Sequence, residues 1–438
     1  MRMRSVMALV AGGVLVVPGC GERAGDGAAG EQPTKEPAAD APAETPGASL
    51  LFLGTPGGVT VFDTETAKVT FDAPGGMPSQ QGNAVVRSLA RNGGTEVSAF
   101  DPRTGDVKWS EQLATSAELR MASHDGSAAV LGPNRPIDGA LPTRSNTTLT
   151  VVRDDGESRG YDLEGNFEPE TFSYDAQKLF LIEYLPAMNP TSYTLRLLDL
   201  ESGALEEVFD AHGGEREPMR GTARTQVYSP DGKRLYTYYQ IFGEPYVETS
   251  TGIHASHSTP EPFYAFVHVL DLEEGWAHCV ELMQPFGTGA PVEPALTVSR
   301  DGSRVYVADQ ALGRVAEIDT AKLAVTREAE LPPSTEYMEG AATMADDSLW
   351  VAFGDRVSSL NMDTLGVSTT FTATGSITAM RADPSGERLY VALLDRLESY
   401  DLATGRRIEE VLQGGPFATT DPNEGVISGP RDTIRCAC

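Results

Sequence analysis

The sequence predicts an all-β fold assembled from one short structural unit that recurs along the chain. From about residue 48, runs of four to seven residues rich in β-branched and aromatic side chains alternate with turns of Gly, Asp, Ser and Pro. No stretch longer than a turn has the apolar periodicity of a helix. One hairpin-like segment recurs in three versions, as YSPDGKRLYTYY at 228–239, SRDGSRVYVAD at 299–309 and DPSGERLYVAL at 383–393.

A second recurring signature sets the length of the unit: an apolar strand, an Asp, a short turn and another strand. Its eight Asp markers are 38 to 72 residues apart and stand at positions 63, 101, 154, 199, 271, 319, 363 and 401. A unit of about forty to fifty residues with four short strands is the sequence signature of a β-propeller blade. We therefore predict a β-propeller of eight blades, or of seven if GGMPSQQGN in the second unit does not form an inner strand.

The two ends of the repeat region complement each other. The first unit offers SLLFLGT, VTVFD and KVTF, which is one strand too few for a blade. A strand-like stretch, GVISGPRDTI at 425–434, follows the last complete unit. A C-terminal strand that joins the first blade would close the ring and cover the edge that an open sheet exposes.

Three strand segments carry a resemblance to a known family. VYVAD at 305–309, LWVAF at 349–353 and LYVAL at 389–393 each follow a turn and precede an Asp-containing hairpin. They resemble the YVTN-type β-propeller repeats of bacterial surface proteins and are also similar to lactonase-like and Tol-associated propellers. The resemblance covers residues 215–412 well and residues 48–214 loosely. Because the matching residues build blades, it implies the fold and little about function.

The N-terminus has the form of an export signal. Two arginines precede an apolar run at 6–17 that is too short to span a bilayer comfortably. The following VVPGC resembles the lipobox of bacterial lipoproteins, which implies lipidation of Cys20, although Pro18 departs from the usual small or β-branched residue. The alternative is a plain secretory signal with an incidental cysteine.

The sequence divides into a signal peptide at 1–20, a disordered Pro/Ala/Gly-rich tether at 21–47 and the propeller at 48–438. The tether has no aromatic and no large aliphatic residue, so it cannot form a core. We expect an exported protein, anchored through Cys20 to the outer leaflet of the cell membrane or to the outer membrane, depending on the host. The net charge of −29 is spread along the chain, which excludes nucleic acid as a partner.

Three consecutive units have long loops between their second and third strands, on the face opposite the repeated turns. Long ordered loops on a rigid scaffold are usual binding places, so we expect a protein, peptide or glycan partner there. The alternatives are solvated loops without a partner, and basic and acidic residues that only pair with one another. The candidate binding residues are Arg135, Asp138, Arg144, Tyr193, Tyr239, Tyr246, His254, His257, Glu261 and Tyr264.

Motifs of catalysis are mostly absent: there is no G-x-S-x-G nucleophile elbow, no P-loop, no H-E-x-x-H and no G-x-G-x-x-G before a helix. The segment FDPRTGDVKW is similar to a quinoprotein repeat, but the adjacent cysteines of that family do not occur. His254 and His257 lack a frame that would set zinc-ligand spacing, so no metal and no cofactor is predicted. A binding module is favoured; the alternatives are a hydrolase or lactonase-like enzyme at the central channel and a structural envelope component.

Overall fold

The structure is a computed structural model. It describes the residues 49–55, 58–133, 142–213, 218–220, 222–241, 265–288, 294–332, 340–345, 348–383, 385–413 and 418–419. All of them belong to the unit Thr45–Cys438, one of two into which the chain divides; the other is Met1–Glu44. The described residues form strands and turns, and none of them lies in a helix that could cross a membrane.

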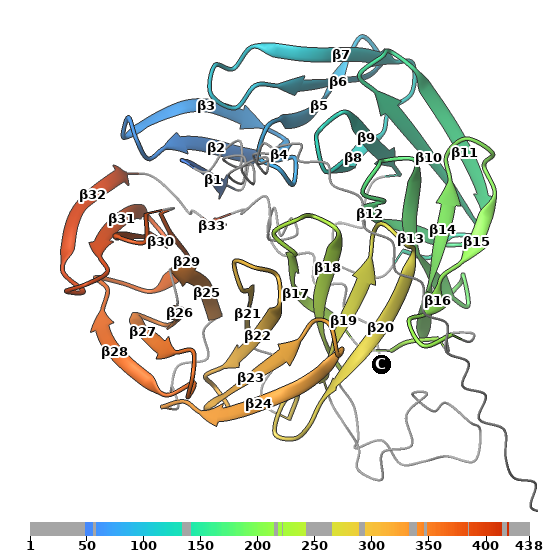
Figure 1. Cartoon of the computed structure of the whole chain (residues 1–438). Helices are drawn as coiled ribbons and strands as arrows, with labels where there is room; N and C mark the ends of the chain where they lie inside the picture. Colours follow the sequence, from blue (N-terminus) through green and yellow to red (C-terminus); the bar gives the residue numbers. More distant parts are fainter. Residues whose placement is uncertain are drawn as a thin grey trace, which may run out of the picture. The chain divides into compact units, whose positions relative to one another are not determined.

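Eight sheets follow one another around a ring in the described part of the chain, which confirms the predicted all-β propeller with eight blades (Figure 1). We number the blades in chain order and give the strands of each from the axis outward. Blade 1 contains β33 (Ala418–Thr419), β1 (Leu50–Thr55), β2 (Gly58–Asp63) and β3 (Lys68–Pro74). Blade 2 contains β4 (Gly76–Pro78), β5 (Val85–Arg91), β6 (Gly94–Phe100) and β7 (Val107–Leu113).

The next two blades carry two of the long loops. Blade 3 contains β8 (Glu118–Ala122), β9 (Ala128–Gly132), β10 (Asn146–Arg153) and β11 (Ser158–Glu164). Blade 4 contains β12 (Phe167–Phe172), β13 (Lys178–Leu185), β14 (Ser192–Asp199) and β15 (Leu205–Glu207).

Blade 5 is the one described blade with a fifth strand. It contains β17 (Thr222–Tyr228), β18 (Arg234–Gln240), β19 (Ala265–Asp271) and β20 (Trp276–Leu282), with β16 (Phe209–Asp210) at its outer edge. Blade 6 contains β21 (Ala295–Val298), β22 (Arg304–Asp309), β23 (Arg314–Asp319) and β24 (Ala324–Glu330).

The last two blades return to the start of the ring. Blade 7 contains β25 (Gly340–Ala345), β26 (Ser348–Phe353), β27 (Arg356–Asn361) and β28 (Val367–Thr372). Blade 8 contains β29 (Ile377–Ala382), β30 (Arg388–Leu393), β31 (Arg396–Asp401) and β32 (Arg407–Gln413).

The recurring Ser-x-Asp-Gly segment forms the hairpin between the first two strands of a blade. In blade 5, Asp231 Oδ1 accepts the backbone N–H of Lys233 at 3.1 Å, and Ser229 Oγ accepts that of Arg234 at 2.9 Å. Gly232 has a φ of 72°, and a Cβ there would lie 2.0 Å from Cε1 of His124 in blade 3. Each turn residue is therefore required by local geometry, which explains why the hairpin recurs.

Six of the eight Asp markers accept backbone N–H groups in the turn between the third and fourth strands. Asp319, for example, accepts the backbone N–H groups of Ala321 and Lys322 at 3.0 and 2.9 Å. In blade 3 the neighbouring Asp155, and not the marker Asp154, accepts such a group, that of Glu157 at 2.8 Å. The marker predicted at Asp363 is displaced: Asn361 makes the equivalent contacts, because its side-chain oxygen accepts hydrogen bonds as a carboxylate does.

Ring closure uses the C-terminal part of the chain, as the sequence predicts. β33 pairs antiparallel with β1 through Leu53↔Thr419 and Gly54↔Ala418. This closing strand lies upstream of the predicted stretch 425–434, which is outside the described residues. The inner strand of blade 2, β4, has only three residues, and its shortness explains why the sequence left seven blades as an alternative.

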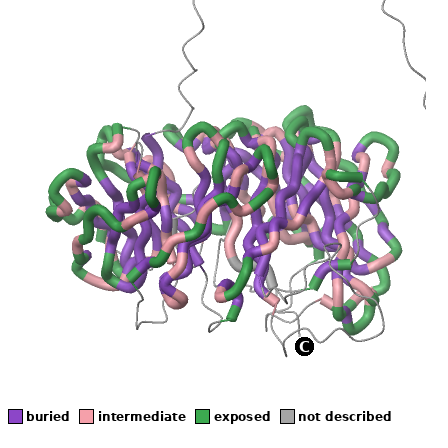
Figure 2. The backbone as a smooth tube through the Cα atoms, turned by 60° about the horizontal axis from the view of Figure 1, so that its bottom comes forward, coloured by how far each residue is buried: buried purple, intermediate pink, exposed green. Residues whose placement is uncertain are grey.

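The hydrophobic core is divided among the blade interfaces. Eight clusters of buried residues occur in the described part of the chain, one between each pair of consecutive blades. The cluster that closes the ring joins Leu51 and Leu53 of blade 1 to Tyr390 and Leu397 of blade 8. Figure 2 shows buried residues along the strands and exposed residues gathered at the turns.

Strand direction assigns each connection to a face of the ring. Because the four strands of a blade alternate in direction, the first and third hairpins lie on one face, the hairpin face. The connections between second and third strands begin on the other face, which we call the long-loop face. In blades 3, 4 and 5 these connections are residues 133–145, 186–191 and 241–264.

Candidate functional site

One buried amide links the bases of two long loops. Asn166, between β11 and β12, is fully buried, and its Oδ1 accepts a hydrogen bond from Arg144 Nε at 3.1 Å. Its Nδ2 donates to the carbonyl of Ala187 at 3.1 Å and also to that of Pro142. Arg144 and Pro142 belong to the loop of blade 3 and Ala187 to the loop of blade 4. Asn166 therefore holds the bases of the two loops together through hydrogen bonds.

A row of aromatic rings joins the loop base of blade 4 to that of blade 5. Tyr193 at the start of β14 meets Tyr184 at 6.5 Å and stacks on Tyr239 of β18 at 5.7 Å between ring centroids. Tyr239 in turn stacks on Phe266 of β19 at 5.1 Å, with the planes 7° apart. All four residues are at most 4% exposed. Stacked, buried rings of this kind fix the ends of the strands from which the loops begin.

The sequence predicts Tyr193 and Tyr239 as ligand contacts, and the structure places both in the core cluster between blades 4 and 5. They gain more from burial at the blade interface than from exposure on the rim, because each ring has a large apolar surface. Both support the loops from below, and direct contact with a ligand remains a prediction for them.

Arg144 belongs to a buried charge cluster with two residues that the sequence analysis did not single out. Glu168 on β12 forms ion pairs with Arg144 and with Arg120 on β8 of the preceding blade. Arg144 also donates to the carbonyl of Phe167 at 2.8 Å. The exposed fractions of the side chains are 3% for Arg120, 10% for Glu168 and 15% for Arg144. The three charges therefore hold the loop of blade 3 against the inner strands of two blades.

A second carboxyl lies two residues further along the same inner strand. The register of β12 against β13 shifts between Pro169 and Thr171, which makes Glu170 the extra residue of a β-bulge. Its carboxylate accepts a hydrogen bond from Gln226 Nε2 of β17 at 2.7 Å. Burial raises the pKa of Glu170 to about 7, so this carboxyl can exchange a proton near neutral pH.

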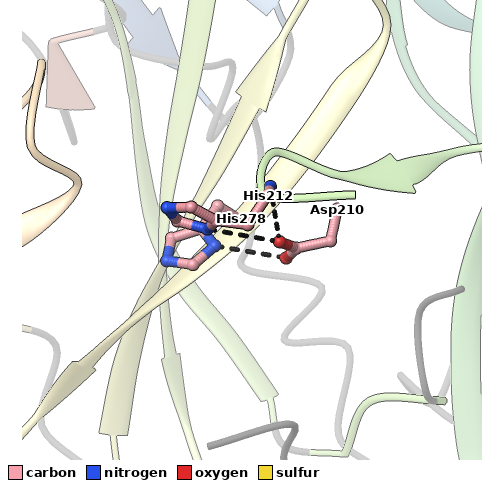
Figure 3. Close-up of side chains that lie close together, drawn as sticks. All are labelled: Asp210, His212 and His278. Atoms are coloured by element: carbon pink, nitrogen blue, oxygen red, sulfur yellow. Dashed lines mark hydrogen bonds and ion pairs between the residues drawn. The ribbon is translucent and has the colours of Figure 1, made fainter. Parts of the chain in front are cut away.

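A different cluster of side chains lies at the outer edge of blade 5. Asp210 at the end of β16, His212 just after it and His278 on β20 converge there (Figure 3). Asp210 Oδ2 is 3.2 Å from His278 Nδ1, and Asp210 Oδ1 is 3.4 Å from His212 Nδ1. These three residues are the group in the described ranges whose side chains could hold a metal ion.

The remaining predicted residues lie outside the described residues: Cys20, Arg135, Asp138, Tyr246, His254, His257, Glu261 and Tyr264. The site residues that the sequence analysis missed are Arg120, Asn166, Glu168, Glu170 and the three residues of the outer cluster. Two acidic residues within one short inner strand, FEPETF, are the signal that could have pointed to Glu168 and Glu170.

Scans against protein-family models and curated proteins give no match. Solved structures similar to the chain include hydrazine synthase of Kuenenia stuttgartiensis, with 16% identity, 86% of this chain and 98% of that chain covered, and a TM-score of 0.41. Dihydro-heme d1 dehydrogenase NirN in complex with DHE has 15% identity, coverages of 88% and 79%, and a TM-score of 0.47. BamB from Moraxella catarrhalis has 14% identity, coverages of 78% and 87%, and a TM-score of 0.40. The ring of eight sheets itself defines the chain as a β-propeller.

Proposed function

We propose that the chain is a binding module whose long-loop face captures a protein, peptide or glycan. The supporting observation is the shared framework under the three long loops. Asn166 joins the loops of blades 3 and 4, and the Tyr193–Tyr239 stack joins the loops of blades 4 and 5. A binding surface requires such rigid support, because loops ordered in advance lose less entropy on binding. Three loops with unrelated roles would not require shared contacts at their bases.

The cellular location of the module is proposed from the sequence. Residues 1–20 are a lipoprotein-type signal peptide, residues 21–47 a tether, and residues 48–438 a propeller of YVTN-type repeats. The VVPGC segment supports lipidation of Cys20. A flexible tether of 27 residues, counted from 21 to 47, has a root-mean-square length of about 30 Å, which would hold the propeller clear of a membrane surface.

The proposed binding face is tested by replacing residues 242–262 with a short Gly-Ser linker. Twenty-four residues, 241–264, separate the end of β18 from the start of β19, yet Gln240 and Ala265 are paired neighbours in the sheet. The linker can therefore close the hairpin without disturbing the blade. Proteins and glycans that co-purify with the wild type from envelope extracts should be lost from this variant.

The matched control changes the opposite face. Lys322 lies 69% exposed in a turn of the hairpin face, so Lys322→Ala should co-purify with the same partners as the wild type. Identical partners for the wild type and the loop-replacement variant would contradict the proposed face.

One observation favours a second candidate function, a hydrolase or lactonase-like enzyme at the central channel. Glu170 lies on an inner strand, and its pKa of about 7 suits a general base at neutral pH. An enzyme of this kind would hydrolyse lactones or esters with a rate that rises near pH 7 and is lost in Glu170→Gln. A binding module would show no such activity in either protein.

A further inference from the structure

The segment that connects blade 4 to blade 5 takes an unusual path. After β15, the outer strand of blade 4, the chain crosses to the outer edge of blade 5 and forms β16. β16 pairs in parallel with β20, with Phe209 opposite Trp276 and Asp210 opposite Ala277. The N–H of Ala211 then donates to the carbonyl of Ala277 at 3.0 Å. This pairing places Asp210 and His212 beside His278.

The spacing of the three side chains fits a tetrahedral zinc site. Zinc bound to nitrogen and oxygen at about 2.0–2.1 Å keeps neighbouring ligand atoms about 3.3–3.4 Å apart. Asp210 Oδ2 lies 3.2 Å from the Nδ1 atom of His278, and Asp210 Oδ1 lies 3.4 Å from the Nδ1 atom of His212. One ligand atom from each residue can be chosen so that all three lie within 4.8 Å of one another. The two contacts use different oxygens of Asp210, so a common ion requires a side-chain rotation that brings the ligand atoms closer together, and the exposed His212 ring can rotate.

The three side chains differ in burial: two are largely buried and the third is exposed. The side chains of His278 and Asp210 are 5% and 20% exposed, whereas that of His212 is 67% exposed. Asp210 Oδ1 also accepts the backbone N–H of His212 at 2.9 Å, which orients the carboxylate. The largely buried side chains of Asp210 and His278 would hold the ion on its protein side, and His212 would bind it from the exposed side. Water can then occupy the fourth position.

We propose that Asp210, His212 and His278 bind one zinc ion at the outer edge of blade 5, with water in the fourth position. Two imidazoles and a carboxylate suit zinc, whereas calcium and magnesium select oxygen ligands. The ion fastens the blade 4 to blade 5 connection to β20. This connection continues to Met219, whose backbone pairs with that of Tyr193 at 2.7 and 2.9 Å at the base of the blade 4 loop.

The test is calorimetric titration of ZnCl2 into the full chain, purified in detergent and freed of metal. Cys436→Ser/Cys438→Ser serves as the parent protein, so that the terminal thiols do not contribute. The parent should bind one zinc ion per chain and no calcium. His212→Ala, a change at an exposed side chain that leaves the core intact, should weaken zinc binding by about 100-fold or more, since even loss of an outer-shell partner costs about 10–100-fold.

The matched control removes the two histidines of the blade 5 loop. His254→Ala/His257→Ala should retain the affinity and stoichiometry of the parent. Absence of zinc binding by the parent, an unchanged affinity in His212→Ala, or loss of binding in the loop variant alone would each overturn the proposal. His278→Gln gives a second check, and its circular dichroism spectrum shows whether the fold is kept.

Discussion

The Glu170 carboxyl should make the stability of the propeller depend on pH, and Glu170→Gln should remove that dependence. The substitution keeps the size of the side chain and leaves an amide oxygen that can accept the hydrogen bond from Gln226. It removes only the charge that the carboxyl acquires on ionisation. The difference between the two proteins therefore isolates the titration of a single group.

The sign and size of this pH dependence follow from the pKa of Glu170 in the folded and unfolded states. The folded protein holds this proton up to about pH 7, whereas the unfolded chain releases it near pH 4.5. Between these values the folded state binds more protons, so the free energy of unfolding falls as the pH rises. The stabilisation is fully present below pH 4.5 and is lost by about pH 7. A shift of this size corresponds to about 3 kcal/mol.

The assay is urea unfolding followed by tryptophan fluorescence at intervals from pH 4.5 to 8, for the wild type, Glu170→Gln and an exposed control, Glu328→Gln. The free energy of unfolding of the wild type, relative to Glu170→Gln, should fall by about 3 kcal/mol over this range. The free energy of unfolding of the wild type, relative to Glu328→Gln, should show no fall of that size. A constant difference between the wild type and Glu170→Gln across the range would refute a raised pKa for Glu170.

Three other changes have expected outcomes. Glu168→Ala removes the carboxylate that two largely buried arginines share and should lower the free energy of urea unfolding by about 3–5 kcal/mol; an unchanged midpoint would contradict the buried cluster. Gly232→Ala places a Cβ 2.0 Å from the His124 ring and should lower the melting temperature more than Gly156→Ala, which has a similar positive φ but open space; equal losses would be inconsistent with this clash. Cys20→Ser should abolish labelling by an alkyne fatty acid and release the protein from membranes, and label that persists would rule out lipidation at this residue.

The fold could be predicted because its determinants are local. Ser229, Asp231 and Gly232 complete their turn with partners within five residues, apart from the close approach of Gly232 to His124. The blade count comes from the eight repeats of the other turn, the Asp-containing one. The closing strand was predicted from a missing partner in blade 1, and the exact segment could not be chosen because a two-residue pairing leaves little trace in a sequence.

The candidate site was less predictable because its contacts join distant parts of the chain. Glu168 is 48 residues from Arg120 and 24 residues from Arg144, and His278 is 68 residues from Asp210. Nothing local marks such pairs. Tyr239 shows a related limit, since a tyrosine at the end of a strand has the same local sequence whether its ring is exposed or stacked in a blade interface.

Site-specific photo-cross-linking in living cells tests the central claim, binding through the long-loop face, most directly. A photoreactive amino acid is placed at Tyr246 in the blade 5 loop or, as the matched position, at Lys322 on the hairpin face. Illumination should give discrete adducts from position 246 and none from position 322. Adducts from position 322 alone, or from neither position, would contradict a binding role for the long-loop face.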